Sequence, residues 1–161
     1  MRKDYILPII IFIPLLIAQI TLVPLVSIDY FAPDLLIIVL VYYTLINGQF
    51  FGTFAGALIG LTFDLASGNL IGLSMFSKTI AGFIAGYFFN ENKIETNTST
   101  ITFSFIIFLA SFVDSFFSGL FSDTQGVGII FILFERSLFP AIYTAIISML
   151  LIIVLPKRKF L

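Results

Sequence analysis

The 161-residue chain contains no cysteine and no histidine, and only 11% of its residues are charged. The missing residue types exclude disulfides, thiol catalysis, haem and iron–sulfur ligation and most zinc chemistry. The formal net charge of −1 argues neither for nor against nucleic-acid binding. No basic patch is large enough to support such binding. No nucleophile has an adjacent base and no phosphate-binding loop is present. We therefore expect no catalytic residues, no cofactor, no metal and no nucleic-acid partner.

Hydrophobic residues make up 60% of the chain. Soluble domains are about 45–50% apolar and about 25% charged, so this composition is typical of a membrane protein. The apolar runs predict one membrane domain, residues 1–161, built as an all-α bundle of six transmembrane helices. The predicted spans are 5–26, 31–46, 50–66, 73–89, 101–121 and 127–155. A span needs about 20 residues, so the second, third and fourth are short, and we expect the long sixth to break near Glu135 and Arg136.

The basic residues predict how the chain crosses the membrane. With six spans, both ends of the chain and its one long polar loop lie on the same side. They carry Arg2, Lys3, Lys93, Lys157, Arg158 and Lys159. The positive-inside rule makes that side cytoplasmic. The opposite turns hold Asp29, Asp34 and Asp123 and no lysine or arginine, so we predict a multi-pass protein with both termini in the cytoplasm.

A row of small residues at four-residue spacing runs from the second turn through the third span. It consists of Gly48, Gly52, Gly56, Gly60, Asp64, Gly68 and Gly72. In a membrane, small residues four apart form a flat helical face that lets another backbone approach closely. The face from Gly48 to Gly60 is expected either to pack inside the protein or to bind a helix of another subunit.

Five ionisable side chains fall within the predicted spans or at their ends. They are Asp64, Lys78, Asp114, Glu135 and Arg136. A charge at mid-membrane costs about 2.5–3.5 kcal/mol, so such groups usually face a partner or a cavity. In the predicted topology, all five lie in the outer half of the bilayer. Asp114 and Arg136 lie at the same depth in the bilayer to within a helical turn, so we predict that they pair. We also predict that Asp64 lies near Lys78, across the short turn between their spans.

Two polar stripes surround these residues at helical spacing. The fifth span carries Ser111, Asp114, Ser115 and Ser118, and the fourth carries Ser74, Ser77, Lys78, Ala81, Gly82, Ala85 and Gly86. Both stripes should face the interior of the bundle. The polar site that they form either neutralises its own charges and fixes the register of the helices, or binds a small polar ligand or the transmembrane helix of a partner.

The chain resembles the bacterial rod shape-determining protein MreD family, most clearly over residues 31–87. The matching residues are Ala32-Pro33-Asp34-Leu35 at the start of a short span, Asn47-Gly48 in the next turn, the glycine row, and then Asp64-Leu65-Ala66-Ser67-Gly68 with Gly72. A small-residue helix that carries Lys78 follows. From residue 101 onward only the hydropathy matches, so the resemblance implies nothing about Asp114, Glu135 or Arg136.

This resemblance implies a non-enzymatic component of the elongation machinery in the bacterial cytoplasmic (inner) membrane. Proteins of this family work with the scaffold MreC and the filament protein MreB, in a machinery that also contains RodA and a class B penicillin-binding protein and that directs lateral peptidoglycan synthesis. The resemblance also implies a six-helix arrangement like that of the substrate-binding subunits of energy-coupling-factor transporters.

Two other functions stay open at this point. The first is a small-molecule, vitamin-type binding subunit of a transporter, with its ligand site around Lys78, Asp114 and Arg136. The second is a purely structural or assembly protein. Amide side chains are nearly absent from the spans, Gln19 being the exception, and the charged residues are able to satisfy one another. This modestly favours docking of partner helices over solute binding.

Overall fold

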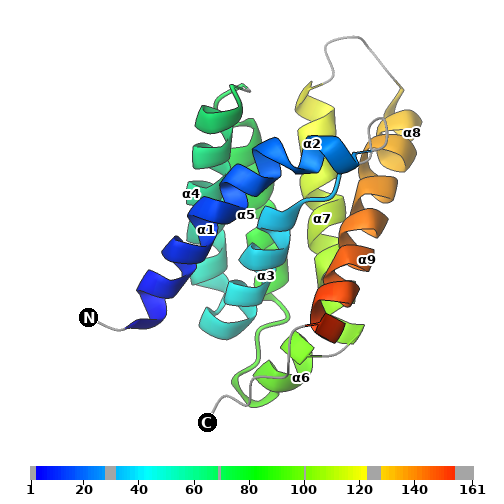
Figure 1. Cartoon of the computed structure of the whole chain (residues 1–161). Helices are drawn as coiled ribbons and strands as arrows, with labels where there is room; N and C mark the ends of the chain where they lie inside the picture. The colour runs from blue at the N-terminus through cyan, green and yellow to red at the C-terminus, as the bar shows by residue number, and fades with distance from the viewer. Residues whose placement is uncertain (1–2, 28–31, 69, 100, 123–127, 155–161) are drawn as a thin grey trace.

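The computed structural model describes residues 3–27, 32–68, 70–99, 101–122 and 128–154, and all its regular elements in these ranges are helices (Figure 1). The all-α expectation is confirmed for this part of the chain. The helices are α1 (Lys3–Thr21), α2 (Val23–Val26), α3 (Leu35–Asn47), α4 (Gln49–Ser67), α5 (Leu73–Gly86), the 3-10 helix η1 (Glu91–Lys93), α6 (Ile94–Ser99), α7 (Ile101–Ser122), α8 (Ile129–Phe131), the π-helix η2 (Ile132–Leu138) and α9 (Phe139–Val154).

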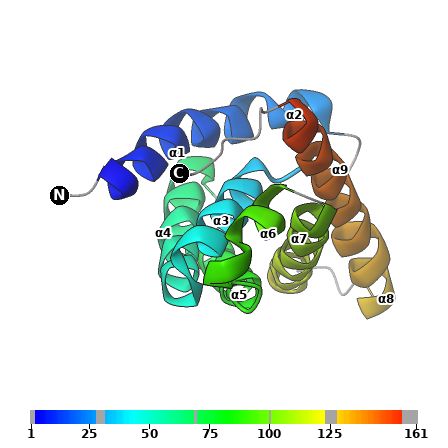
Figure 2. The same cartoon turned by 90° about the horizontal axis from the view of Figure 1, so that it is seen from below.

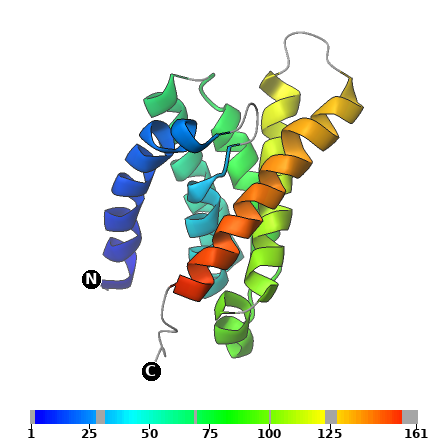
Figure 3. The same cartoon turned by 45° about the vertical axis from the view of Figure 1, so that its right-hand side comes forward.

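The long helices run alternately in opposite directions. Helices α1, α4 and α7 run upward in Figures 1 and 3, and α3, α5 and α9 return. The start of α1, the α3–α4 turn, α6 and the end of α9 therefore share one end of the bundle, which we call the α6 end. The α4–α5 turn, α2 and α8 lie toward the opposite end, which we call the α8 end.

Three stretches of the described chain are long and apolar enough to cross a membrane, namely Gln49–Ser67, Ile101–Ser122 and Ile129–Leu150. The other apolar helical stretches, Phe12–Leu25, Leu35–Asn47 and Leu73–Gly86, are shorter. Helix α3, for instance, has 13 residues and rises about 20 Å, whereas the hydrocarbon core is about 30 Å thick. The structure thus supports membrane insertion, and the number of crossings stays a prediction.

The charged residues used to predict the orientation are only partly described. Lys3 begins α1 and Lys93 ends η1, both toward the α6 end. Arg2, Asp29, Asp123, Lys157, Arg158 and Lys159 lie outside the described residues.

Helix α3 forms the centre of the bundle. Viewed along the bundle in Figure 2, it lies among α1, α4, α5, α6 and α7. Its side chains Ile37 and Val41 are completely buried, and they join apolar residues of two neighbouring helices in one core. The other core residues are Ile38, Leu40 and Leu45 of α3, Ala81 and Ala85 of α5, and Phe103, Ile106, Ile107 and Ala110 of α7. Because α3 is short and central, its first residue lies below the α8-end tips of α4 and α7 (Figures 1 and 3).

The glycines of the row serve two different purposes. Gly52, Gly56 and Gly60 are buried where α4 packs against α5. A Cβ on Gly56 would collide with the carbonyl group of Lys78, and one on Gly60 with the backbone of Ser74 and Met75. Of the two alternatives predicted for this face, the structure shows packing inside the protein, because α5 of the same chain covers these three glycines.

The remaining glycines of the row form turns. Gly48, Gly68 and Gly72 have φ values of 94°, 71° and 99°, a backbone region that favours glycine because it has no Cβ. Gly48 separates α3 from α4, and Gly68 ends α4 by donating its N–H to the carbonyl of Asp64. These turns allow α3, α4 and α5 to follow one another with short connections.

The predicted break in the sixth span is a π-helical turn. Phe139 donates its N–H to Phe134, five residues earlier, instead of four. Pro140 has no N–H to donate, and its ring crowds the carbonyl group four residues before it, that of Arg136, which favours a wider turn at this point. The wider turn contains Glu135 and Arg136, and Ser137 supports it by a hydrogen bond to the carbonyl of Ile132 (2.8 Å).

Substitution of Gly56 by alanine should destabilise the protein, because the new methyl group meets the backbone of α5 and not a flexible side chain. Overpacking of this kind costs about 1–3 kcal/mol. The measurement is the unfolding midpoint in mixed detergent micelles. Gly128→Ala is the matched control, since a Cβ there meets no atom within 4 Å. Equal midpoints for both variants would contradict the α4–α5 contact.

Candidate functional site

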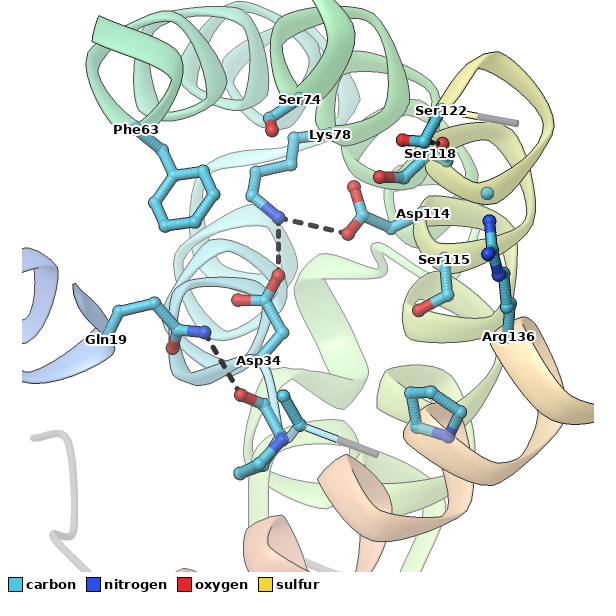
Figure 4. A pocket seen from close by; sticks show the side chains of 14 residues that line it. Gln19, Asp34, Phe63, Ser74, Lys78, Asp114, Ser115, Ser118, Ser122 and Arg136 are labelled. Carbon is cyan, nitrogen blue, oxygen red and sulfur yellow. Dashed lines mark hydrogen bonds and ion pairs between the residues drawn. The ribbon is translucent and has the colours of Figure 1, made fainter. Parts of the chain in front are cut away.

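Three charged side chains from three parts of the bundle meet toward the α8 end (Figure 4). The Nζ atom of Lys78 on α5 lies 2.5 Å from Oδ2 of Asp34, which precedes α3, and 3.0 Å from Oδ2 of Asp114 on α7. Ser77 donates a hydrogen bond to the other oxygen of Asp114 (2.7 Å). The side chains of Lys78 and Asp114 are only 3% and 8% exposed. We call Asp34, Lys78 and Asp114 the ion triad.

The two polar stripes explain how Lys78 and Asp114 reach each other. All seven residues of the α5 stripe are buried, as predicted. Of the α7 stripe, Ser111 and Asp114 are buried, and Ser115 and Ser118 are partly buried. The ring of Phe63 on α4 covers the ammonium group at 5.8 Å from the ring centroid, within the range of a cation–π contact. The stripes therefore place the charged groups away from the apolar outer surface.

Asp34 also completes the start of α3. The first N–H groups of a helix have no partner within the helix, and inside an apolar bundle water does not supply one. Oδ1 of Asp34 accepts from Leu36 and Ile37 (2.9 and 3.1 Å), and its other carboxylate oxygen binds Lys78. This is the N-cap arrangement that favours aspartate.

Two neighbouring helices satisfy the remaining N–H groups at the start of α3. The N–H of Leu35 donates to the side-chain oxygen of Gln19 on α1 (2.8 Å), and the N–H of Asp34 donates to Thr144 on α9 (3.1 Å). The amide of Gln19 donates in turn to the carbonyl of Pro33 (3.1 Å). The start of α3 is thus bound to α1, α5 and α9 at once.

Asp64 completes the start of α5 in the same way. Its carboxylate is fully buried at the end of α4 and accepts hydrogen bonds from the N–H groups of Gly72, Ser74 and Met75 at 2.9–3.2 Å. The left-handed conformations of Gly68 and Gly72 fold the short connection so that these groups point back at Asp64. The α4–α5 hairpin is therefore closed by one carboxylate.

A polar cavity lies beside the ion triad, with a volume of ≈ 290 Å³. Arg136 and three serines of α7 line it together with the triad, so two acidic and two basic side chains share its wall (Figure 4). The lining residues are Gln19, Ala32, Pro33, Asp34, Phe63, Ser74, Lys78, Asp114, Ser115, Ser118, Gly119, Ser122, Arg136 and Pro140.

The predicted pairing of the charged residues needs one correction. Asp114 binds Lys78 and Ser77, so the predicted Asp114–Arg136 pair is wrong; Arg136 lies against Gly119 of α7 and lines the cavity instead. Asp64 caps α5, the helix that carries Lys78. The carboxylate oxygens of Asp64 bind backbone N–H groups, whereas the ammonium group of Lys78 binds Asp34. Glu135 is partly exposed and does not line the cavity.

Sequence reasoning missed the contributions of Asp34, Gln19 and Thr144. The signal for Asp34 was present: the end of the bundle at which α3 begins is also the end at which α5 begins, only five residues before Lys78. A helix that starts inside a bundle needs a cap, and a carboxylate there also attracts the nearest cation. Thr144 left no comparable signal, because its neighbours in the sequence are apolar.

The chemistry available at the site is that of fixed charges and hydrogen bonds. Within the described residues, no group of three histidine, cysteine, aspartate or glutamate side chains could hold a metal ion. The charged groups of the triad bind one another, and Asp64 binds backbone. Such an arrangement holds helices in one register.

Replacing Lys78 by methionine should leave the buried Asp114 and the partly buried Asp34 facing each other without a cation and destabilise the protein by about 3–5 kcal/mol. The triple variant Asp34→Asn, Lys78→Met, Asp114→Asn should recover much of that loss, because it removes all three charges. Unfolding midpoints in detergent provide the measurement, and the exposed Lys93→Met is the control. If Lys78→Met alone unfolds like the control, the triad does not stabilise the bundle.

Replacing Asp64 by alanine should leave three N–H groups at the start of α5 without their acceptor. Loss of an N-cap costs about 0.5–2 kcal/mol, and the buried position favours the upper part of this range. Hydrogen exchange of residues 72–75 in micelles should accelerate. Asn90→Ala removes an exposed cap from η1 and should leave those residues unchanged. Unaltered exchange in the Asp64→Ala variant would be evidence against this role.

Comparison with known proteins gives one match. The family model described as rod shape-determining protein MreD matches residues 2–160. No curated protein and no solved structure matches the chain, so the predicted likeness to transporter subunits receives no support from a known structure. The family match extends over nearly the entire chain, including the part that contains Asp114, Glu135 and Arg136. The chain therefore belongs to the rod shape-determining protein MreD family.

Proposed function

We propose that this protein is a non-enzymatic scaffold of the bacterial elongation machinery that docks the transmembrane helices of partner proteins. Family membership gives it a role in rod-shape determination and a place in the membrane. The further steps, docking of an MreC-like scaffold and the organisation of lateral peptidoglycan synthesis, are our proposal. MreB, RodA and a class B penicillin-binding protein are the other proposed members of the assembly.

The observation that carries the docking proposal is the internal pairing of the charged groups of the ion triad and of Asp64. Lys78 binds two carboxylates and Asp64 binds three backbone N–H groups. These contacts fix α3, α5 and α7 relative to one another, as a platform for other proteins requires. The same contacts occupy the charged groups, which a catalytic or transport cycle would need to free from their partners.

We further propose six crossings of the inner membrane, with both termini in the cytoplasm. The alternating directions of α1, α3, α4, α5, α7 and α9 and the location of Lys3 and Lys93 toward the α6 end support this topology. The α8 end, with the ion triad and the polar cavity, would then face the extracytoplasmic side.

A vitamin-binding function is less well supported by the cavity. Binding pockets for small molecules have volumes of about 300–1,000 Å³ and apolar or aromatic walls with a few converging polar groups. The cavity here, at ≈ 290 Å³, lies at the lower end of this range, and its charged side chains include the mutually bound triad.

Depletion of the protein in a rod-shaped host tests the proposal. We expect round cells with delocalised wall synthesis, rescued by re-expression, and co-purification of the MreC-like protein with the tagged chain in mild detergent. Normal cell shape combined with failed uptake of one vitamin would contradict the proposal and support the transporter function. Normal shape with normal uptake would contradict both.

A further inference from the structure

Glu135 is the one intramembrane charge of the predicted set for which the described structure provides no use. The stretch Ile129–Leu150 is apolar enough to cross a membrane, and its charged residues are Glu135 and Arg136. Glu135 lies six residues after Ile129, about 9 Å along the helix. Among the residues that the structure describes, none forms a hydrogen bond or ion pair with its carboxylate.

The π-helical turn gives Glu135 and Arg136 different surroundings. The aliphatic part of Arg136 lies against Gly119 and its guanidinium group reaches the cavity (Figure 4). Glu135 is absent from the cavity wall and is partly exposed. Single π-helical turns within α-helices occur frequently at functional sites, and here the turn separates a charged residue that lines the cavity from one at the surface of the bundle.

Apolar side chains surround Glu135 on the outer surface of the last helix. Phe134 is 57% exposed, Phe139 46% and Ile130 75%, and one turn further along α9 the exposed Ile142 continues the surface. We call Ile130, Phe134, Glu135, Phe139 and Ile142 the Glu135 face. A charge within such a face is expensive in lipid unless a partner of opposite charge meets it.

We propose that the Glu135 face binds the transmembrane helix of a partner that carries an arginine or lysine at the depth of Glu135. Charge complementarity selects this occupant: an apolar helix covers the phenylalanines, and its cation neutralises the carboxylate. Basic side chains are uncommon near the outer ends of spans because of the positive-inside rule, so such a pair would distinguish the correct partner from other apolar helices. This inference rests on the proposed docking function and adds the face and the chemistry of recognition.

The test uses the full-length tagged protein and the MreC-like scaffold expressed together. Glu135→Gln keeps the size of the side chain and removes its charge, and Glu135→Arg reverses the charge. We expect each to reduce co-purification of the scaffold roughly tenfold, as for loss of one interhelical polar contact. Glu91→Gln and Glu91→Arg, at an exposed site in η1, are matched controls that should bind like the unaltered protein.

A charge exchange and a cross-link complete the design. An acidic residue in place of the scaffold's basic one should restore binding to Glu135→Arg. Since the chain has no native cysteine, Phe134→Cys should cross-link to cysteines introduced in the scaffold's transmembrane helix, whereas Phe54→Cys on α4 should not.

Each result has a definite meaning. Undiminished binding by Glu135→Gln would overturn the inference, even if Glu135→Arg fails to bind or to accumulate, and would leave the docking function intact. Cross-linking through Phe54→Cys alone would also overturn it. If the unaltered protein fails to bind the scaffold, the proposed docking function is wrong and the inference is lost with it.

Discussion

The fold depends on satisfying the N–H groups at the starts of two helices, α3 and α5. The short central helix α3 begins below the tips of its neighbours, and side chains satisfy its first N–H groups. Asp34, Gln19 and Thr144 accept all of them, and Asp64 accepts three of those at the start of α5. The carboxylate that caps α3 also binds the ammonium group of Lys78, and Lys78 binds a second acid, Asp114. The cap of the short central helix is thus part of the ion triad.

This constraint links the glycine face to the polar site. Lys78 reaches Asp34 and Asp114 only because α5 lies directly on α4, and Gly52, Gly56 and Gly60 make that contact possible. One side of α5 is therefore occupied by close backbone packing and the adjacent side by charge pairing. In a membrane, where burial of apolar surface does not drive helices together, these two kinds of contact are the principal means of fixing their arrangement. A fixed arrangement is what a member of the rod shape-determining protein MreD family needs if it positions partner helices.

The sequence predicted the helical class, the buried stripe of α5 and the break near Glu135 and Arg136, because each depends on local features of the sequence. It failed for the partners of Asp114, and it did not predict that Asp34 caps α3 or that the Asp64 carboxylate binds backbone N–H groups. Those depend on how far each helix is rotated and on where α3 starts, and depth along a span does not determine either. The match in depth between Asp114 and Arg136 was real evidence of proximity, since both line one cavity, but a closer lysine takes the carboxylate.

The most direct test of this account is solid-state nuclear magnetic resonance of the full-length protein in lipid bilayers, with magnetisation transferred from the side-chain nitrogen of Lys78 to carboxylate carbons. The account predicts transfer to two aspartates, which Asp34→Asn and Asp114→Asn would assign individually. Transfer from Arg136 to Asp114, with none from Lys78 to either acid, would contradict it.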